Sequence, residues 1–175
     1  LSGSVNSPSI LGEVDLSSLS YPKFKTTLSD ADLQFKKGTI SAQAKYLKIG
    51  NSDFSGTMNM SSNFAKIITI NSLDFNSNYI DSDELLKLFS SMPNTQTTSG
   101  PSLPLTIKSG KGKVAKFKSG NLLPENITFN FNLNNNLLNV SDLIASFADG
   151  KVEAKASYNI ANTKTTVDAT LKSLN

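Results

Sequence analysis

The sequence predicts a mostly β fold, an antiparallel meander of strands with one or two short helices. Apolar and polar residues alternate in many short segments, turn-forming residues separate these segments, and only one stretch has helix-like chemistry. Alternation with a period of two places apolar side chains on one face of a strand and polar side chains on the other. The 175 residues are enough for one good core, or for two small modules that share a continuous sheet.

The strongest alternating segments lie in the C-terminal half. Between residues 126 and 133, apolar residues alternate with Asn and Thr, and between 151 and 160 they alternate with Lys, Glu, Ser and Asn. Each segment predicts a strand with one apolar face and one polar face. Shorter segments of the same kind occur at 40–44, 54–60 and 167–171.

Short turn sequences separate the predicted strands. Residues 36–38, 134–136 and 148–150 carry Gly or Asn, which tolerate the positive φ angles of tight hairpins. Strands joined by such turns are antiparallel neighbours. We therefore expect a meander rather than a fold with crossover helices.

One segment, residues 81–91, predicts a short helix. It opens on acidic residues, which suit the N-terminal end of a helix dipole, and continues with Leu and Phe. Pro93 ends it, and the polar stretch 93–104 predicts a flexible linker. The chain thus divides into a first β module at 1–92, which ends in the helix, and a second at 105–175, which we expect to be truncated at its C-terminus.

The two modules resemble each other weakly. A strand, a short turn, a second strand and then an aromatic residue before Gly follow in the same order at 33–58 and at 129–152. Such a repeat predicts stacked β units in which each completes the core of its neighbour. The chain begins at Leu1 and stops at Asn175 within strand-like sequence, so we expect a piece of a longer protein.

Composition argues against an enzyme. The chain contains no Cys, His, Trp or Arg. It therefore lacks a thiolate nucleophile, the usual general base at neutral pH and the side chains that most often bind zinc. We accordingly predict no catalytic residue, no metal site and no cofactor. A carbohydrate-binding domain is disfavoured, because the chain has no Trp and only four Tyr to stack on sugars.

Lysines are densest within residues 108–118, and two interpretations are open. The group could form a patch for phosphates or anionic lipid headgroups. It could instead be the solvated face of a strand, which we favour because edge lysines also discourage aggregation. Nucleic-acid readout is not expected, because Arg is absent and no aromatic residues interleave with the lysines in a recognisable motif. The group consists of Lys108, Lys111, Lys113, Lys116 and Lys118.

Acidic residues raise a similar choice. Asp81, Asp83 and Glu84 could ligate a hard cation, but the remaining ligands of a calcium loop are missing, and helix capping explains the group better. Two further carboxylate pairs are expected at the surface, because nothing in the sequence places them in a cleft. They are Asp30/Asp32 and Asp149/Glu153.

The apolar face of such a sheet must be covered. With few helices available, the sheet either folds onto itself as a sandwich or barrel, or part of the face stays open as a groove. A groove binds acyl chains by burying methylenes, at roughly 0.8 kcal/mol per CH2. A sealed β core without a ligand is the alternative. The candidate lipid-groove residues are Ile127, Phe129, Phe131, Leu133, Val152, Ala154, Ala156 and Tyr158.

Several of these segments resemble the AsmA family of bacterial envelope proteins, specifically its C-terminal region. The second module carries the fuller match, and residues 79–86 are similar to the family's strand-to-helix junction. The chain departs from typical members in its heavy use of Asn, Ser and Lys and in its lack of Arg. The matching segments of the second module are 103–107, 112–114, 120–127, 136–140, 143–147 and 149–152.

The resemblance implies a long, curved, taco-like sheet with an apolar concave face, in a periplasmic protein anchored in the inner membrane. AsmA-like proteins are similar to bridge-like lipid transfer proteins, which implies a phospholipid or other acyl-chain lipid as partner, with other envelope proteins as further candidates. We therefore expect a non-catalytic lipid-binding or lipid-transfer module involved in outer-membrane biogenesis. The alternative is a structural or adhesive β module with a sealed core and no ligand.

Overall fold

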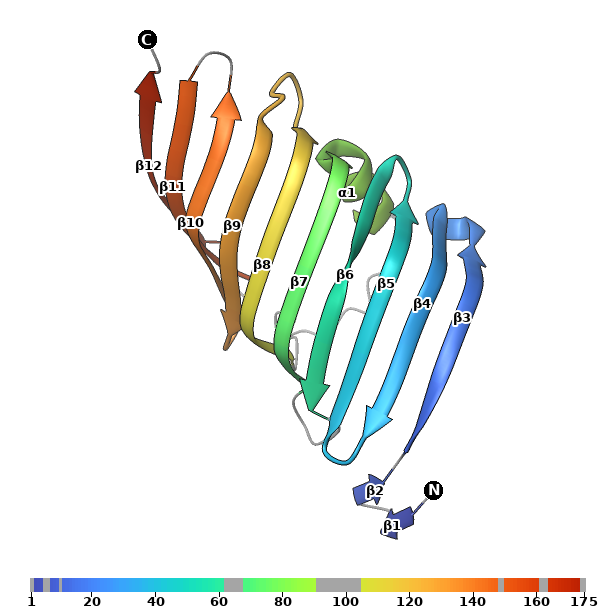
Figure 1. Ribbon diagram of the computed structural model, residues 1–175. Coiled ribbons are helices and arrows are strands. Elements are labelled where there is room, and N and C mark those ends of the chain that lie inside the picture. The colour runs from blue at the N-terminus through green and yellow to red at the C-terminus, as the bar shows by residue number, and fades with distance from the viewer. Residues whose placement is uncertain are drawn as a thin grey trace.

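The computed structural model describes residues 2–4, 7–9, 11–61, 68–90, 105–147, 150–160 and 164–173. Its main body is a single sheet of ten strands, which is twisted and not closed (Figure 1). A two-stranded ribbon, β1 (Ser2–Ser4) with β2 (Ser7–Ser9), precedes the sheet. A 3-10 turn, η1 (Pro22–Phe24), and a helix, α1 (Ser82–Ser90), complete the described elements. The predicted fold class is confirmed.

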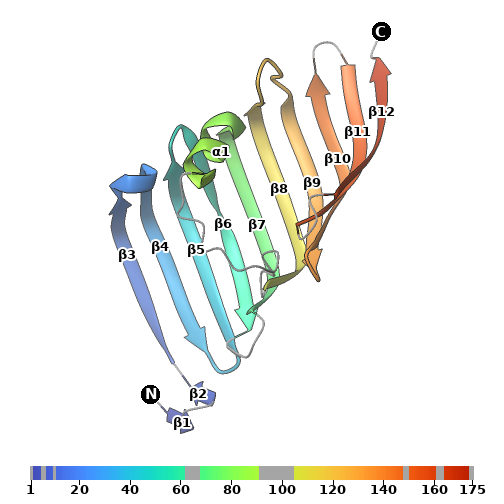
Figure 2. The same ribbon diagram turned by 180° about the vertical axis from the view of Figure 1, so that it is seen from behind.

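The strands lie in the sheet in the order of the sequence (Figures 1 and 2). All neighbours are antiparallel except β7 and β8, which are parallel. The strands are β3 (Gly12–Tyr21), β4 (Thr26–Lys36), β5 (Thr39–Ile49), β6 (Ser52–Ser61), β7 (Ile68–Asp81), β8 (Leu105–Lys118), β9 (Glu125–Asn134), β10 (Leu137–Phe147), β11 (Gly150–Asn159) and β12 (Lys164–Ser173).

The parallel pair divides the sheet into two meanders, β3–β7 and β8–β12. A parallel neighbour requires the chain to return to the end of the sheet where β7 began. The connection from β7 to β8 begins with helix α1, and a purely antiparallel meander holds only within each half. The hydrogen-bonded ladder nevertheless continues from β7 to β8, and the two halves form one sheet.

The two meanders correspond strand by strand. The hairpin turn between the second and third strands lies at Gly38 (φ 81°) in the first half and at Asn135 and Asn136 (φ 49° and 63°) in the second. The third and fourth strands shift register in both halves, between Ala44 and Leu47 and between Val140 and Leu143. The strand order, the position of the hairpin turn and the position of the register shift are therefore the same in both halves, in agreement with the predicted repeat.

Cross-strand register separates an apolar face from a polar face, because residues directly opposite each other share a face. One apolar row takes a residue from each of the ten strands: Val14, Leu33, Ala42, Met58, Leu73, Gly110, Phe131, Val140, Ala156 and Val167. A neighbouring polar row runs through Asp15, Asp32, Gln43, Thr57, Asp74, Lys111, Asn130 and Ser141.

Helix α1 lies at one end of this sheet, near the ends of β6 and β7 (Figure 2). Its Leu85 packs against a buried cluster formed by Ile80, Val114, Ile127 and Ala145. Because Phe75 and Phe129 of the apolar face pack against the same cluster, α1 covers one end of that face. The apolar face of the described strands is otherwise not covered by a second sheet.

The acidic residues at the start of α1 cap and tether the helix. Asp81 Oδ1 accepts a hydrogen bond from the Glu84 backbone N–H at 3.1 Å, as an N-cap does, and its Oδ2 lies 3.2 Å from Lys118 Nζ. Asp83 accepts from the Gly120 N–H at 2.9 Å, and Glu84 accepts from the Asn51 N–H at 2.6 Å. Asp81 thus caps the helix, as the capping interpretation predicts, whereas Asp83 and Glu84 tether the helix to other segments.

Protonation of Asp81 is expected to loosen this end of the sheet. The hydrogen bond from Glu84 N–H and the Lys118 ammonium hold the pKa of Asp81 below its usual 3.8, although burial acts in the opposite direction. A lowered folded-state pKa stabilises the protein above the unfolded pKa, and the contribution is lost as pH falls through the folded value. Urea unfolding between pH 6 and pH 2.5 should therefore show a shallower pH dependence for Asp81→Asn than for the native chain.

Asp15→Asn is the matched control for that experiment, because Asp15 is exposed on edge strand β3. The change caused by Asp81→Asn should exceed that caused by Asp15→Asn, which removes a carboxylate that caps no helix. If Asp81→Asn and Asp15→Asn had the same effect, the cap would not explain acid sensitivity.

Candidate functional site

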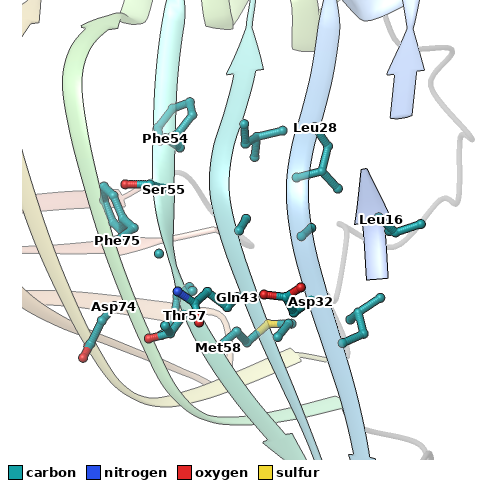
Figure 3. Close-up of a pocket in the computed structure, with 17 residues that line it drawn as sticks. Leu16, Leu28, Asp32, Gln43, Phe54, Ser55, Thr57, Met58, Asp74 and Phe75 are labelled. Atoms are coloured by element: carbon teal, nitrogen blue, oxygen red, sulfur yellow. The ribbon is translucent and has the colours of Figure 1, made fainter. Parts of the chain in front are cut away.

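An apolar trough of about 300 Å³ lies on the sheet across β3 to β7 (Figure 3). Its floor consists of small residues, and larger side chains rise on both sides and at both ends. The floor residues are Ala31, Ala44 and Gly56. The larger apolar residues are Leu16, Leu28, Leu33, Leu47, Phe54, Met58, Leu73 and Phe75.

Register creates the trough. Leu16, Ala31, Ala44, Gly56 and Phe75 are successive cross-strand partners on β3, β4, β5, β6 and β7. The three small residues in the middle therefore lie side by side, and their missing side-chain volume makes one continuous depression. Gly56 cannot be enlarged, because a Cβ there would overlap the backbone carbonyl of Asp74.

A backbone irregularity at Asp30 widens the apolar lining. Leu28 and Ala31 both line the trough, although strict alternation would place them on opposite faces. Asp30 between them has φ 50°, a left-handed conformation that Asp tolerates better than most residues. Of the predicted carboxylate pair Asp30/Asp32, the first therefore shapes the backbone. The second lies in the polar row.

Some polar residues also border the trough. Asp32, Gln43, Thr57 and Asp74 belong by register to the polar row described above, and Ser55 lies beside Phe54 on β6. The site therefore has an apolar floor and apolar sides. The polar residues that border it occupy strand positions that belong to the polar face of the sheet. This lining favours a ligand that is itself apolar along its length.

A cluster of phenylalanines bounds the trough at β7. The ring centroid of Phe75 lies 6.3 Å from that of Phe54, 5.8 Å from that of Phe129 and 6.1 Å from that of Phe131. The Phe129 and Phe131 centroids are 5.8 Å apart. These separations are typical of favourable edge-to-face and tilted aromatic contacts. We call these four residues the aromatic cluster.

Two glycines of β8 allow the aromatic cluster to form. Phe75 on β7 and Phe129 on β9 are separated by β8, whose Gly112 is the cross-strand partner of both. A Cβ at Gly112 would lie 2.6 Å from Phe129 Cε1, and closer still to its Cζ. Gly110 bears the same relation to the Phe131 ring. The rings of β7 and β9 therefore meet over a strand that has no side chain at these positions.

The predicted lipid-groove residues all share the apolar face, but they do not line the trough. On β9, Ile127 and Leu133 are buried, while Phe129 and Phe131 are half-buried over the glycines. On β11, three are half-buried and Tyr158 is 37% exposed. Strand β10 separates the two groups. The three half-buried residues of β11 are Val152, Ala154 and Ala156.

Sequence reasoning missed the trough because its floor comes from three separate strands. The signal available was the small residues among the apolar positions of segments 40–44 and 54–60, where Ala44 and Gly56 leave room. Their alignment depends on register, which the sequence does not show. The contact between Phe75 and the predicted residues Phe129 and Phe131 is where the trough and the predicted groove meet.

Two of the five lysines of β8 are paired with carboxylates. Lys116 lies 3.7 Å from Glu125, and Lys118 is paired with Asp81. Lys111 lies in the polar row, opposite Asp74. This distribution agrees with the solvated-strand interpretation.

The remaining acidic prediction concerned the pair Asp149/Glu153. Glu153 lies 3.1 Å from Lys151, and Asp149 lies outside the described residues. Within the described part of the chain, no group of Asp or Glu residues could hold a metal ion. No helix in that part is long and apolar enough to cross a membrane.

Comparison of the whole chain with protein-family models, with curated proteins and with solved structures finds no match. The functional argument therefore rests on the geometry of the sheet and on the resemblance noted from the sequence.

Proposed function

We propose that this chain is a non-catalytic module that binds the acyl chains of lipids on the apolar face of its sheet. The observation that carries the proposal is the trough, a depression with a floor of small residues and apolar sides, on a face that no second sheet covers among the described strands. An apolar depression bordered by polar residues is a common form of ligand-binding groove.

An acyl chain matches the trough energetically. Burial contributes roughly 0.8 kcal/mol per methylene, so a chain of about ten methylenes contributes about 8 kcal/mol before the cost of association. That cost is at least about 4 kcal/mol, which makes short chains poor ligands and long chains adequate ones. Polar solutes gain little, because the apolar sides offer them few hydrogen-bonding partners.

The AsmA resemblance supports the biological setting of the proposal. An AsmA-like parent protein would be anchored in the inner membrane and would present this module in the periplasm. Phospholipids, or other lipids with acyl chains, would be the ligands, and outer-membrane biogenesis would be the process served. An open sheet that carries an apolar trough across β3–β7 suits a module on which the acyl chains of such ligands lie.

A second role is favoured by a different part of the sheet. Around β8 the apolar face is packed by the protein's own rings, since Phe129 and Phe131 cover the glycines there. This packed region leaves no room for a ligand, as expected of a structural or adhesive module with a sealed core. The proposed lipid site is therefore confined to the trough of β3–β7.

Uptake of lipid by the delipidated chain tests the proposal. Saturable binding of a fluorescent long-chain fatty acid, together with phospholipid in organic extracts of the freshly purified protein, is the expected result. The variant Phe129→Glu/Phe131→Glu, if it still folds, should retain much of this uptake, because these rings lie beyond the trough. Absence of saturable uptake would contradict lipid binding and would favour the sealed structural module.

A further inference from the structure

We infer that the trough holds a single acyl chain laid across the strands, and that Phe75 is the end wall that limits the length of this chain. The inference rests on the proposed function and goes beyond it. It assigns chain-length selectivity to one residue, and it makes the trough a bounded site, distinct from the apolar surface of β9–β12.

The direction of the chain follows from the floor. Leu16, Ala31, Ala44, Gly56 and Phe75 form one row perpendicular to the strands. A second row, Leu28–Leu47–Phe54, lies on one side of it, and a third, Leu33–Ala42–Met58–Leu73, lies on the other. Each side row lies one same-face position, about 7 Å, from the floor row, so the two side rows are about 14 Å apart. Because their Leu, Phe and Met side chains fill part of this width, the space that remains accepts one chain.

The length of the site follows from the strand spacing. From β3 to β7 there are four inter-strand steps of about 4.8 Å, or about 19 Å in all. At the β3 end the row finishes with Leu16 on an edge strand. At the β7 end it finishes with Phe75, whose ring stands directly beyond the Gly56 floor. Phe75 therefore limits the length of chain that the trough buries, and carbon atoms beyond that length lie outside the trough at the β3 edge, where they gain no burial.

Phe75 is held in place from three sides. The Phe54 ring contacts it from β6, and the Phe129 and Phe131 rings contact it across β8. The bare backbone of Gly112 lets the β9 rings approach this closely. A ring packed against three others resists displacement by a ligand, so it acts as a fixed stop.

A chain-length series tests the inference. Unlabelled saturated fatty acids of increasing length would compete with a bound fluorescent fatty acid on the native chain, on Phe75→Leu and on Phe75→Ala. The milder Leu variant guards against loss of the fold in the Ala variant. We expect both variants to bind the longest acids at least tenfold more tightly, relative to the shortest, than the native chain does.

Phe35→Ala is the matched control, because Phe35 is half-buried and pairs with Ile40 on the apolar face, but does not line the trough. It should leave the length dependence unchanged. If the native protein, Phe75→Leu and Phe75→Ala all bind fatty acids with the same length dependence, Phe75 is not the end wall. The proposal that the trough binds lipid would not be contradicted by that result. If no acid binds the native chain, the proposed function fails, and the inference fails with it.

Discussion

Replacing Gly112 with alanine is expected to destabilise the sheet by about 1–3 kcal/mol, the usual cost of forcing extra volume into a packed site. Alanine would ordinarily improve a strand interior, because glycine there costs roughly 0.5–1 kcal/mol in backbone entropy. Here the added Cβ would lie 2.6 Å from Phe129 Cε1, so the ring would have to leave its place over β8. A lower urea midpoint with an unchanged slope would show the loss of stability.

A double-mutant cycle separates this steric cause from a general intolerance of β8. In a Phe129→Ala background the ring is gone, so adding Gly112→Ala should cost little or should stabilise the chain. Contacting residues depart from additivity by 0.5–3 kcal/mol in such cycles. If the changes in unfolding free energy for Gly112→Ala and Phe129→Ala were strictly additive, the Phe129 ring would not pack on Gly112 as described. The pair Gly110 and Phe131 offers an independent repeat of the test.

Filling the trough is expected to abolish lipid uptake while leaving the fold intact or more stable. In the double variant Ala42→Leu/Ala44→Leu, protein side chains occupy the space proposed for ligand. The two substitutions add six carbon atoms, and exclusion of about six methylenes costs about 4.8 kcal/mol, which weakens binding roughly three-thousandfold. Filling an apolar depression commonly stabilises a protein by about 0.5–2 kcal/mol. Fluorescent fatty-acid titration and urea unfolding would measure the two effects.

The test is specific because the double variant should lose lipid uptake while its stability is unchanged or increased. Lys48→Leu is the matched control, since Lys48 follows Leu47 on β5 but is exposed and does not line the trough. It adds the same side chain to the same strand outside the trough and should leave uptake unchanged. Equal loss of uptake in Lys48→Leu and in the double variant would place the binding surface elsewhere.

Local features of this protein follow from the sequence with good accuracy. Alternation at 126–133 predicted the two faces of β9, and the acidic opening of 81–91 predicted helix α1 (Ser82–Ser90) with its Asp81 cap. The turns at Gly38 and at Asn135–Asn136 lie where the sequence indicates them. These features depend on residues within a few positions of each other, through the pleat of a strand, the orphan N–H groups of a helix and the φ preferences of Gly and Asn.

Tertiary structure decided the features that depend on register. The trough exists because Ala31, Ala44 and Gly56 become cross-strand partners, and the aromatic cluster exists because Gly112 separates Phe75 from Phe129. The parallel pairing of β7 with β8 was likewise decided by the assembled sheet. A shift of one residue reverses the face of a whole strand, so register is a collective property of all the pairings in the sheet. The sequence by itself therefore determined which residues are apolar and where they alternate along a strand, and the assembled sheet determined which of them share a face and enclose a site.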